Sequence, residues 1–132
     1  MALKIKLRPE ERVFINGALL RNGGTAVELE VLNRVPLLRE KDILLEADAD
    51  TPCKRLYLLL QTLYFEPPNA LEYYRHFSKL SMEVLRAAPS MGSFLEKVHL
   101  LVEEGELYRA LRELKSLLDY ESQLMENAQQ SQ

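Results

Sequence analysis

The spacing of hydrophobic residues changes once along this chain, and that change divides it into two parts. Up to about residue 45, apolar and polar residues alternate with a period of two, which is typical of half-buried strands. From Thr51 onward, apolar residues recur at the three- and four-residue spacing of a helix. Strands followed by helices predict an α+β fold, with the helices packed on one side of a sheet or beside it.

The first part is predicted to form an antiparallel β meander of four or five short strands. In LKIKL (residues 3–7) the aliphatic residues face one way and the lysines the other, and TAVELEV (residues 25–31) alternates in the same manner with glutamates. Asn16 and Gly17 lie between apolar runs, and both residues accept the positive φ of a type I′ hairpin turn. Pro36 confines the last short strand to an edge or a bulge.

The second part is predicted to form a bundle of about four α-helices. The first begins at Thr51 and Pro52, an N-cap followed by a proline in the first turn, and its apolar residues indicate burial on most sides. Asn69 is expected to cap the second helix, with Glu72 reaching back toward it. The boundaries between helices are predicted at Pro67-Pro68, Pro89 and Gly105, and the fourth helix runs to about Asn127.

The 132 residues suit a single domain with a β-rich subdomain (1–45), a helical subdomain (51–127) and a frayed tail (128–132). The net charge is −3: the β-rich part holds eight Lys and Arg against six Asp and Glu, and residues 46–132 hold nine against fourteen. We expect no membrane span, because no apolar run approaches the roughly 18 residues required. The N-terminus does not resemble a secretory signal, and a single cysteine fits the reducing cytoplasm.

The residue types indicate no enzyme, no metal site and no cofactor. His76 and His99 lie in different predicted helices, and neither has a metal-ligating partner four residues on. Cys53 lies beside a helix start, which would lower its pKa, but a small buried thiol is the favoured interpretation because no histidine is near it in sequence. The glycines at residues 23 and 24 lie inside a hairpin pattern and do not open a helix, so they do not form a phosphate-binding loop.

Five segments, in this order and spacing, resemble the FlbT family of flagellum-biosynthesis repressors from certain flagellated bacteria. They are LKIKLRPEERVFINGA at the start, LREKDIL (38–44), ADTPCKRLYLLLQTLY (49–64), GELYRAL (105–111) and DYE (119–121). The resemblance covers essentially the whole chain. It implies a cytoplasmic post-transcriptional regulator that associates with the 5′ untranslated region of a flagellin messenger RNA and promotes its decay, although some members act as activators.

Two other functions stay open beside that one. The chain would alternatively be a protein–protein adaptor or chaperone-like module that binds flagellin or another flagellar regulatory protein through its helices, with indirect effects on RNA. The third alternative is an undetected hydrolase such as a nuclease.

An acidic protein that binds RNA must gather its cations locally, because phosphate binding depends on the local field more than on net charge. Cations are concentrated around the joint between the two parts of this chain. Tyr57, beside two of them, would stack on a base if it is exposed, although packing between helices is the favoured interpretation for most of the aromatic residues. The candidate RNA-binding residues are therefore Arg34, Arg39, Lys41, Lys54, Arg55 and Tyr57.

The competing interpretation of these cations is structural. Residues 39–42 alternate in sign, so they would pair with the helical part and fix the joint. Asp48 and Asp50 are near Lys54 and Arg55 in sequence. Cations at a helix N-terminus also oppose the helix dipole, by roughly 0.3–1 kcal/mol when exposed, and an external anion would offset that cost.

Self-association is expected as well. A meander of a few short strands leaves open edges that pair readily with another chain, and LKIKL and TAVELEV contain no proline to prevent it. The first helix is more apolar than a small domain easily covers. Both features predict a symmetric homo-oligomer, with a monomer whose other helices wrap the first as the alternative.

Overall fold

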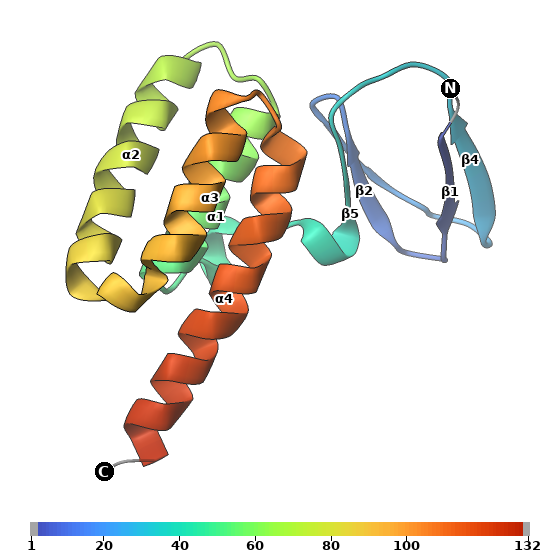
Figure 1. The fold of residues 1–132 in the computed structure, drawn as a ribbon. Coiled ribbons are helices and arrows are strands. Elements are labelled where there is room, and N and C mark those ends of the chain that lie inside the picture. Colours follow the sequence, from blue (N-terminus) through green and yellow to red (C-terminus); the bar gives the residue numbers. More distant parts are fainter. Residues whose placement is uncertain (1–2, 131–132) are drawn as a thin grey trace. The chain divides into compact units, whose positions relative to one another are not determined.

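The computed structural model describes residues 3–130, which fall into two compact units that meet between Ile43 and Leu44 (Figure 1). The predicted α+β class is confirmed, because antiparallel strands precede helices in the described chain. The strands of the first unit are β1 (Leu3–Leu7), β2 (Arg12–Ile15), β3 (Ala18–Arg21), β4 (Val27–Val31) and β5 (Leu37–Arg39).

The strands of the first unit form two small sheets, and their order differs from that of a simple meander. One sheet pairs β1 with β4, and the other has the order β3-β2-β5. The register explains the first pairing: Ile5 lies opposite Leu29, Lys4 opposite Glu30 and Lys6 opposite Glu28. Each lysine of β1 therefore lies opposite a glutamate of β4, and apolar residues lie opposite apolar residues. Both kinds of cross-strand pair stabilise the pairing of β1 with β4.

The hairpin expected at Asn16-Gly17 is confirmed. These residues join β2 to β3 with φ values of 46° and 92°, the positive angles of a type I′ turn. Beyond β3, the Asn22 amide nitrogen reaches the carbonyl oxygens of Leu7 at 3.2 Å, Arg8 at 3.1 Å and Thr25 at 2.9 Å. One side chain thus joins the end of β1 to the loop before β4.

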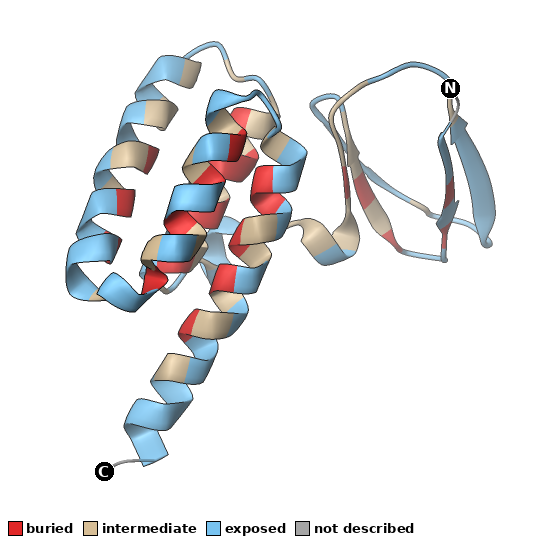
Figure 2. Ribbon diagram, viewed as in Figure 1, coloured by how far each residue is buried: buried red, intermediate tan, exposed pale blue. Residues whose placement is uncertain are grey.

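The first unit has a small core. Ile5, Leu7 and Val13 are buried together, and three partly buried aliphatic residues pack against them. Figure 2 shows how few buried positions this unit has compared with the helices. Polar contacts such as those of Asn22 are therefore a large part of what holds it together.

The second unit consists of α1 (Pro52–Tyr64), α2 (Ala70–Ala87), α3 (Gly92–Glu103) and α4 (Leu107–Gln130). Short 3₁₀ turns cover Glu40–Asp42, Glu46–Asp48 and Pro89–Met91. α1 packs against α2 and α4, and α3 packs against α4. Helix α4 continues to Gln130, so residues 128–130 of the expected frayed tail are helical, and residues 131 and 132 lie outside the described part. Among the described helices, none is long and apolar enough to cross a membrane.

Local signals set two of the helix ends as expected and a third differently. The Thr51 hydroxyl accepts a hydrogen bond from the Lys54 amide at 3.2 Å, as an N-cap should. Gly105 has φ +77° and forms a Schellman motif, in which its amide binds the Val102 carbonyl and the next amide binds Leu101. Asn69 precedes α2, but its side chain makes no capping hydrogen bond to the described residues.

A buried carboxylate from α4 completes the start of α1. Glu121 is 7% exposed, and its two oxygens accept hydrogen bonds from the Thr51 hydroxyl at 2.5 Å and from the Cys53 amide at 3.1 Å. The first amides of a helix have no partner within the helix, and the N-terminal end carries a partial positive charge. Glu121 satisfies one of these amides and supplies a negative charge, so it links the start of α1 to the second half of α4.

A buried amide side chain holds the chain segment that enters the second unit. The Gln61 side chain of α1, 6% exposed, accepts a hydrogen bond from the Leu44 amide at 2.9 Å and donates one to the Leu44 carbonyl at 3.0 Å. Both backbone groups of Leu44 are therefore paired as in a strand ladder. Helix α1 thus holds the segment before it through Gln61, and it is joined to α4 through Glu121.

Replacing Glu121 with alanine is expected to lower the free energy of unfolding by about 1–3 kcal/mol, because a buried amide and a hydroxyl lose their acceptor. Glu121→Gln keeps one acceptor oxygen and should lose less. The measurement is urea unfolding followed by circular dichroism. Glu126→Ala, at an exposed position of the same helix, is the matched control. Equal midpoints for the two alanine variants would contradict the role given to Glu121.

The homo-oligomer stays a prediction, and the strands show where to test it. β3 is the outer strand of its sheet, and all four of its residues are exposed, with Leu19 and Leu20 exposed by 54% and 45%. We expect light scattering coupled to size exclusion to give a mass above one chain at micromolar protein, and Leu20→Lys to lower it. A single mass near 15.3 kDa, held across dilution and salt, would rule the oligomer out.

Candidate phosphate-binding surface

The two units divide the predicted RNA-binding residues. Arg34, Arg39 and Lys41 belong to the first unit, and Lys54, Arg55 and Tyr57 belong to the second. Each group is therefore a separate candidate surface within its own unit.

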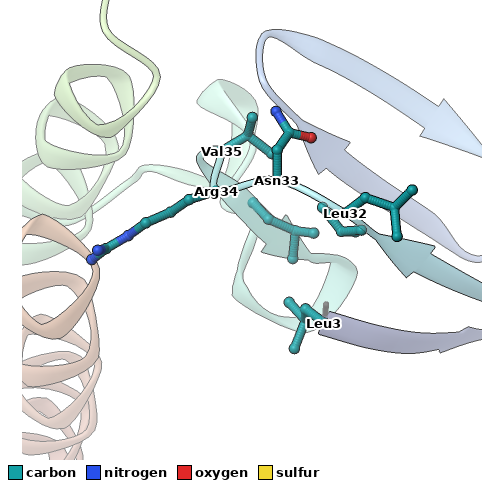
Figure 3. Close-up of a pocket in the computed structure, with 7 residues that line it drawn as sticks. Leu3, Leu32, Asn33, Arg34 and Val35 are labelled. Atoms are coloured by element: carbon teal, nitrogen blue, oxygen red, sulfur yellow. The ribbon is translucent and has the colours of Figure 1, made fainter. Parts of the chain in front are cut away.

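Arg34 follows β4 and lies apart from the other two cations of its unit. It is exposed and lines a pocket of about 430 Å³ whose other walls are mostly aliphatic, including Leu3, Leu32 and Val35 (Figure 3). Phosphate is bound best by grouped cations, and Arg34 is the single cation among the residues that line this pocket. Arg34 is therefore the weakest of the three candidates in this unit.

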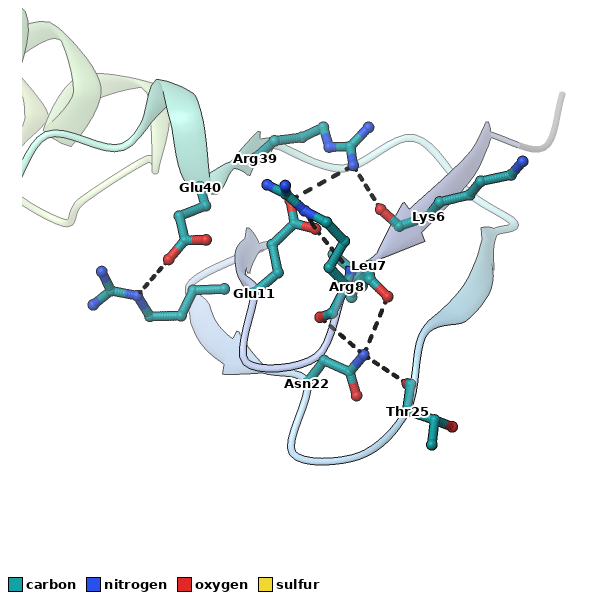
Figure 4. Close-up of polar contacts among 9 residues, drawn as sticks. Lys6, Leu7, Arg8, Glu11, Asn22, Thr25, Arg39 and Glu40 are labelled. Atoms are coloured by element: carbon teal, nitrogen blue, oxygen red, sulfur yellow. Dashed lines mark hydrogen bonds and ion pairs between the residues drawn. The ribbon is translucent and has the colours of Figure 1, made fainter.

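Arg39 and Lys41 share an open pocket of about 490 Å³ with Lys6 and Arg8. Figure 4 shows the polar contacts around Lys6, Arg8 and Arg39. Sequence reasoning did not select Lys6 and Arg8, although the alternation in β1 places Lys6 on the face away from the core. The end of β1 and the end of β5 thus bring four cations to one place. Two glutamates, Glu11 and Glu40, complete the lining.

Glu11 organises the two arginines of this pocket. Its carboxylate accepts a hydrogen bond from the Arg8 amide at 2.9 Å, and it lies 3.7 Å from both the Arg8 and the Arg39 guanidinium nitrogens. The hydrogen bond from the Arg8 backbone amide, followed by the charge of Arg39, holds the pKa of Glu11 below its usual value. Burial has the opposing effect. Arg39 also donates a hydrogen bond to the Lys6 carbonyl at 2.6 Å. Glu11 therefore stays ionised at neutral pH and fixes the positions of both guanidinium groups.

The pocket is locally cationic in an acidic protein. Glu40 accepts a hydrogen bond from Arg12 at 3.1 Å, so part of its charge is balanced by a cation outside the pocket lining. Four cations then face one further carboxylate. The expected pairing of Arg39 is present, but its partners Glu11 and Lys6 belong to its own unit.

In the second unit, the cations at the start of α1 already have anions nearby. Lys54 Nζ lies 3.1 Å from Asp50 Oδ1, and the hydrogen bond from Lys54 lowers the pKa of that carboxyl. Glu121 supplies the negative charge at the helix terminus. The negative charge that would offset the dipole cost is therefore supplied by the protein itself, and RNA binding by Lys54 and Arg55 stays a prediction. Arg55 is exposed and has no ion pair within residues 3–130.

The proposed stacking of Tyr57 on a base is corrected by its burial. The residue is 2% exposed, because α1 buries a wide face that includes Leu56 and Leu60. A base cannot reach a ring that the protein covers, so the packing interpretation holds for Tyr57. Tyr64 likewise packs within the unit, with its ring centroid 6.2 Å from that of Tyr108.

The cysteine thiol and the serine hydroxyl that contacts a histidine are both buried. Cys53 is 0% exposed, and burial, followed by the charge of Glu121, raises the pKa of its thiol to about 12. This confirms a buried, unreactive thiol. Ser81 Oγ lies 2.8 Å from His99 Nε2, a contact that sequence reasoning missed because the residues lie on different helices. Ser81 is 4% exposed, so the pair joins α2 to α3 and its hydroxyl is closed to a substrate.

Comparison with known proteins gives a consistent family. A family model described as "Flagellar protein FlbT" matches residues 3–125. Rhodopseudomonas palustris has a relative named probable flagellum biosynthesis repressor protein FlbT, 36% identical over 95% of this chain and 98% of its own length. A similarly named Bradyrhizobium diazoefficiens protein is 34% identical over 94% of this chain and 85% of its own length. The Caulobacter vibrioides flagellum biosynthesis repressor protein FlbT is 29% identical over 93% of this chain and 89% of its own. No solved structure gives a significant match.

The His99 contact predicts a pH dependence of stability. Burial lowers the pKa of His99 below 6.5, against an opposing effect of the Glu103 charge, so the folded state favours the neutral imidazole. Between about pH 7 and 5 the unfolded chain then binds more protons than the folded one, and the free energy of unfolding should fall as pH falls.

The variant that tests this is His99→Gln, which should flatten the slope between pH 7 and 5 in urea unfolding. His76→Gln, at an exposed position of α2, should keep the slope. The carboxyl pKa values that are lowered, those of Glu11 and Asp50, start from 4.5 and 3.8, so their effects fall at lower pH. An unchanged slope in His99→Gln would refute the assignment.

Proposed function

The chain belongs to the FlbT family of flagellar proteins, and from this premise we propose that it is a non-enzymatic regulator that binds the 5′ untranslated region of a flagellin messenger RNA and promotes its decay. The family relation supports a regulatory role in flagellum biosynthesis. The observation that supports RNA as the ligand is the grouping of Lys6, Arg8, Arg39 and Lys41 around one open pocket.

The pocket suits a phosphodiester group for two reasons. Its guanidinium groups present planar forks of N–H donors that match phosphate oxygens. Both lie 3.7 Å from Glu11, which is longer than a hydrogen bond, so Glu11 makes no short bond to either, although one Arg39 nitrogen donates to the Lys6 carbonyl at 2.6 Å. A phosphate that enters the pocket would meet cations that are already in place, which reduces the entropy lost on binding.

The decay step is assigned to a cellular ribonuclease that acts on the bound messenger. Cys53 and Ser81, the thiol and the hydroxyl that contacts a histidine, are both buried. The protein would thus select the messenger and leave cleavage to another enzyme.

The alternative, an adaptor that binds flagellin or another flagellar regulatory protein, has an observation in its favour. Leu71, Met82 and Leu85 on α2 are exposed by 63%, 58% and 42%, and their spacing places them on one side of the helix. Exposed apolar residues that share a face often mark a protein-binding surface. An adaptor would show no specific affinity for the leader RNA.

Binding of the purified protein to a flagellin leader RNA, measured across salt concentrations, tests the proposal. The logarithm of the binding constant should fall linearly with the logarithm of salt, because neutralised phosphates release counterions. Arg8→Ala with Lys41→Ala should weaken binding to every RNA sequence tested and make the slope shallower by about 0.7 per cation removed, the value for single-stranded RNA. Both side chains are exposed, so the fold should survive.

The matched control is Lys4→Ala with Arg21→Ala, which removes two exposed cations of the same unit outside the pocket. It should keep most of the slope. Lys54→Ala with Arg55→Ala tests the start of α1 in the same assay, and we expect a smaller loss because Asp50 already pairs with Lys54. No binding by the wild-type protein would overturn the proposal, and RNA cleavage by the purified protein would favour a nuclease.

A further inference from the structure

A second cationic pocket lies in the helical unit, between α3 and α4. It has a volume of about 410 Å³, and its walls combine three cations with one carboxylate and two uncharged residues. The lining consists of Lys97, Leu101, Arg109, Arg112, Glu113 and Ser116. None of these residues was selected from the sequence, because Lys97 and the arginines are distant along the chain and meet only when α3 packs on α4.

The charges of this pocket are unbalanced. Glu113 Oε2 lies 3.4 Å from Lys97 Nζ, so the one carboxylate of the lining is already paired. Arg109 and Arg112 are exposed, and neither has an ion pair within the described chain. Glu106, the acidic residue just before α4, is not paired with either of them.

Helical geometry places the two arginines side by side. Residues three apart on a helix are surface neighbours, with Cβ atoms about 5–6 Å apart, so two guanidinium groups converge on one opening. Ser116, one turn after Arg112, adds a hydroxyl donor to the same row. Like charges at this spacing repel each other, and an anion held between them removes that repulsion.

We propose that Arg109 and Arg112, with Ser116, form a second phosphate-binding site that holds backbone phosphates of the same messenger RNA. This inference rests on the proposed function and extends it to the helical unit, whose net charge of −5 would otherwise repel RNA. Guanidinium forks are suited to phosphate oxygens, and the local field at the opening is positive despite the charge of the unit. One phosphate-binding site on each unit raises the affinity for a strand that reaches both.

The test is the salt dependence of binding to a flagellin leader RNA by the full chain carrying Arg109→Ala and Arg112→Ala. Losing two phosphate contacts should make the slope shallower by about 1.4 for single-stranded RNA, with weaker binding at every salt concentration. Arg75→Ala with Arg86→Ala is the matched control, because it removes the same charge from two exposed positions of α2. The control should leave the slope nearly unchanged.

Arg109→Lys with Arg112→Lys separates the charge from the guanidinium fork. It keeps the charge and the helix, so it should restore the salt slope while leaving part of the affinity lost. An alanine variant that behaves like the α2 control would overturn the second site and leave the first pocket untouched. Absence of RNA binding by the wild-type protein would overturn the proposed function and the second site together. That result is distinct from failure of the second site alone, in which the wild-type protein binds RNA and the alanine variant keeps its salt slope.

Discussion

The contact between Glu121 and the start of α1 is the interaction on which the helical unit depends. Helix α1 packs against both α2 and α4, so an error in its position would propagate to both neighbours. The Glu121 carboxylate accepts hydrogen bonds from the Thr51 hydroxyl and the Cys53 backbone amide, and these two bonds set where α1 begins relative to α4. Hydrophobic packing alone is less directional, because a leucine-rich face tolerates small shifts along the helix axis.

Ion pairs within the protein decide which cations are available to a ligand. Cations with a built-in anion, such as Lys54 beside Asp50, are already balanced within the protein. Arg109 and Arg112 have no such partner in the described chain. In the pocket lined by Lys6, Arg8, Arg39 and Lys41, the single carboxylate of Glu11 lies beside two arginines. Phosphate binding is therefore expected where the protein leaves positive charge uncompensated, which proximity in sequence alone does not indicate.

Local signals predicted much of this fold, and long-range contacts account for what the sequence did not show. The turn at Asn16-Gly17, the cap at Thr51 and the end at Gly105 each depend on a few adjacent residues. The pairing of β1 with β4 depends on residues far apart in the sequence, as does the placement of Glu121. Lys6 and Arg8 were not selected from the sequence for the same reason, because they come together with Arg39 only when the strands fold.

Arg39 shows why binding and stability are linked in the first unit. Its guanidinium holds the Lys6 carbonyl and lies beside Glu11, and the hydrophobic core of this unit is small. Removing Arg39 would therefore take away a proposed phosphate ligand and a structural contact together, and a loss of RNA affinity in such a variant would not identify a binding role. Arg8 and Lys41 are more exposed than Arg39, so their removal should disturb the fold less. In a unit with so small a core, a cation such as Arg39 also helps to hold the strands, through the Lys6 carbonyl and Glu11.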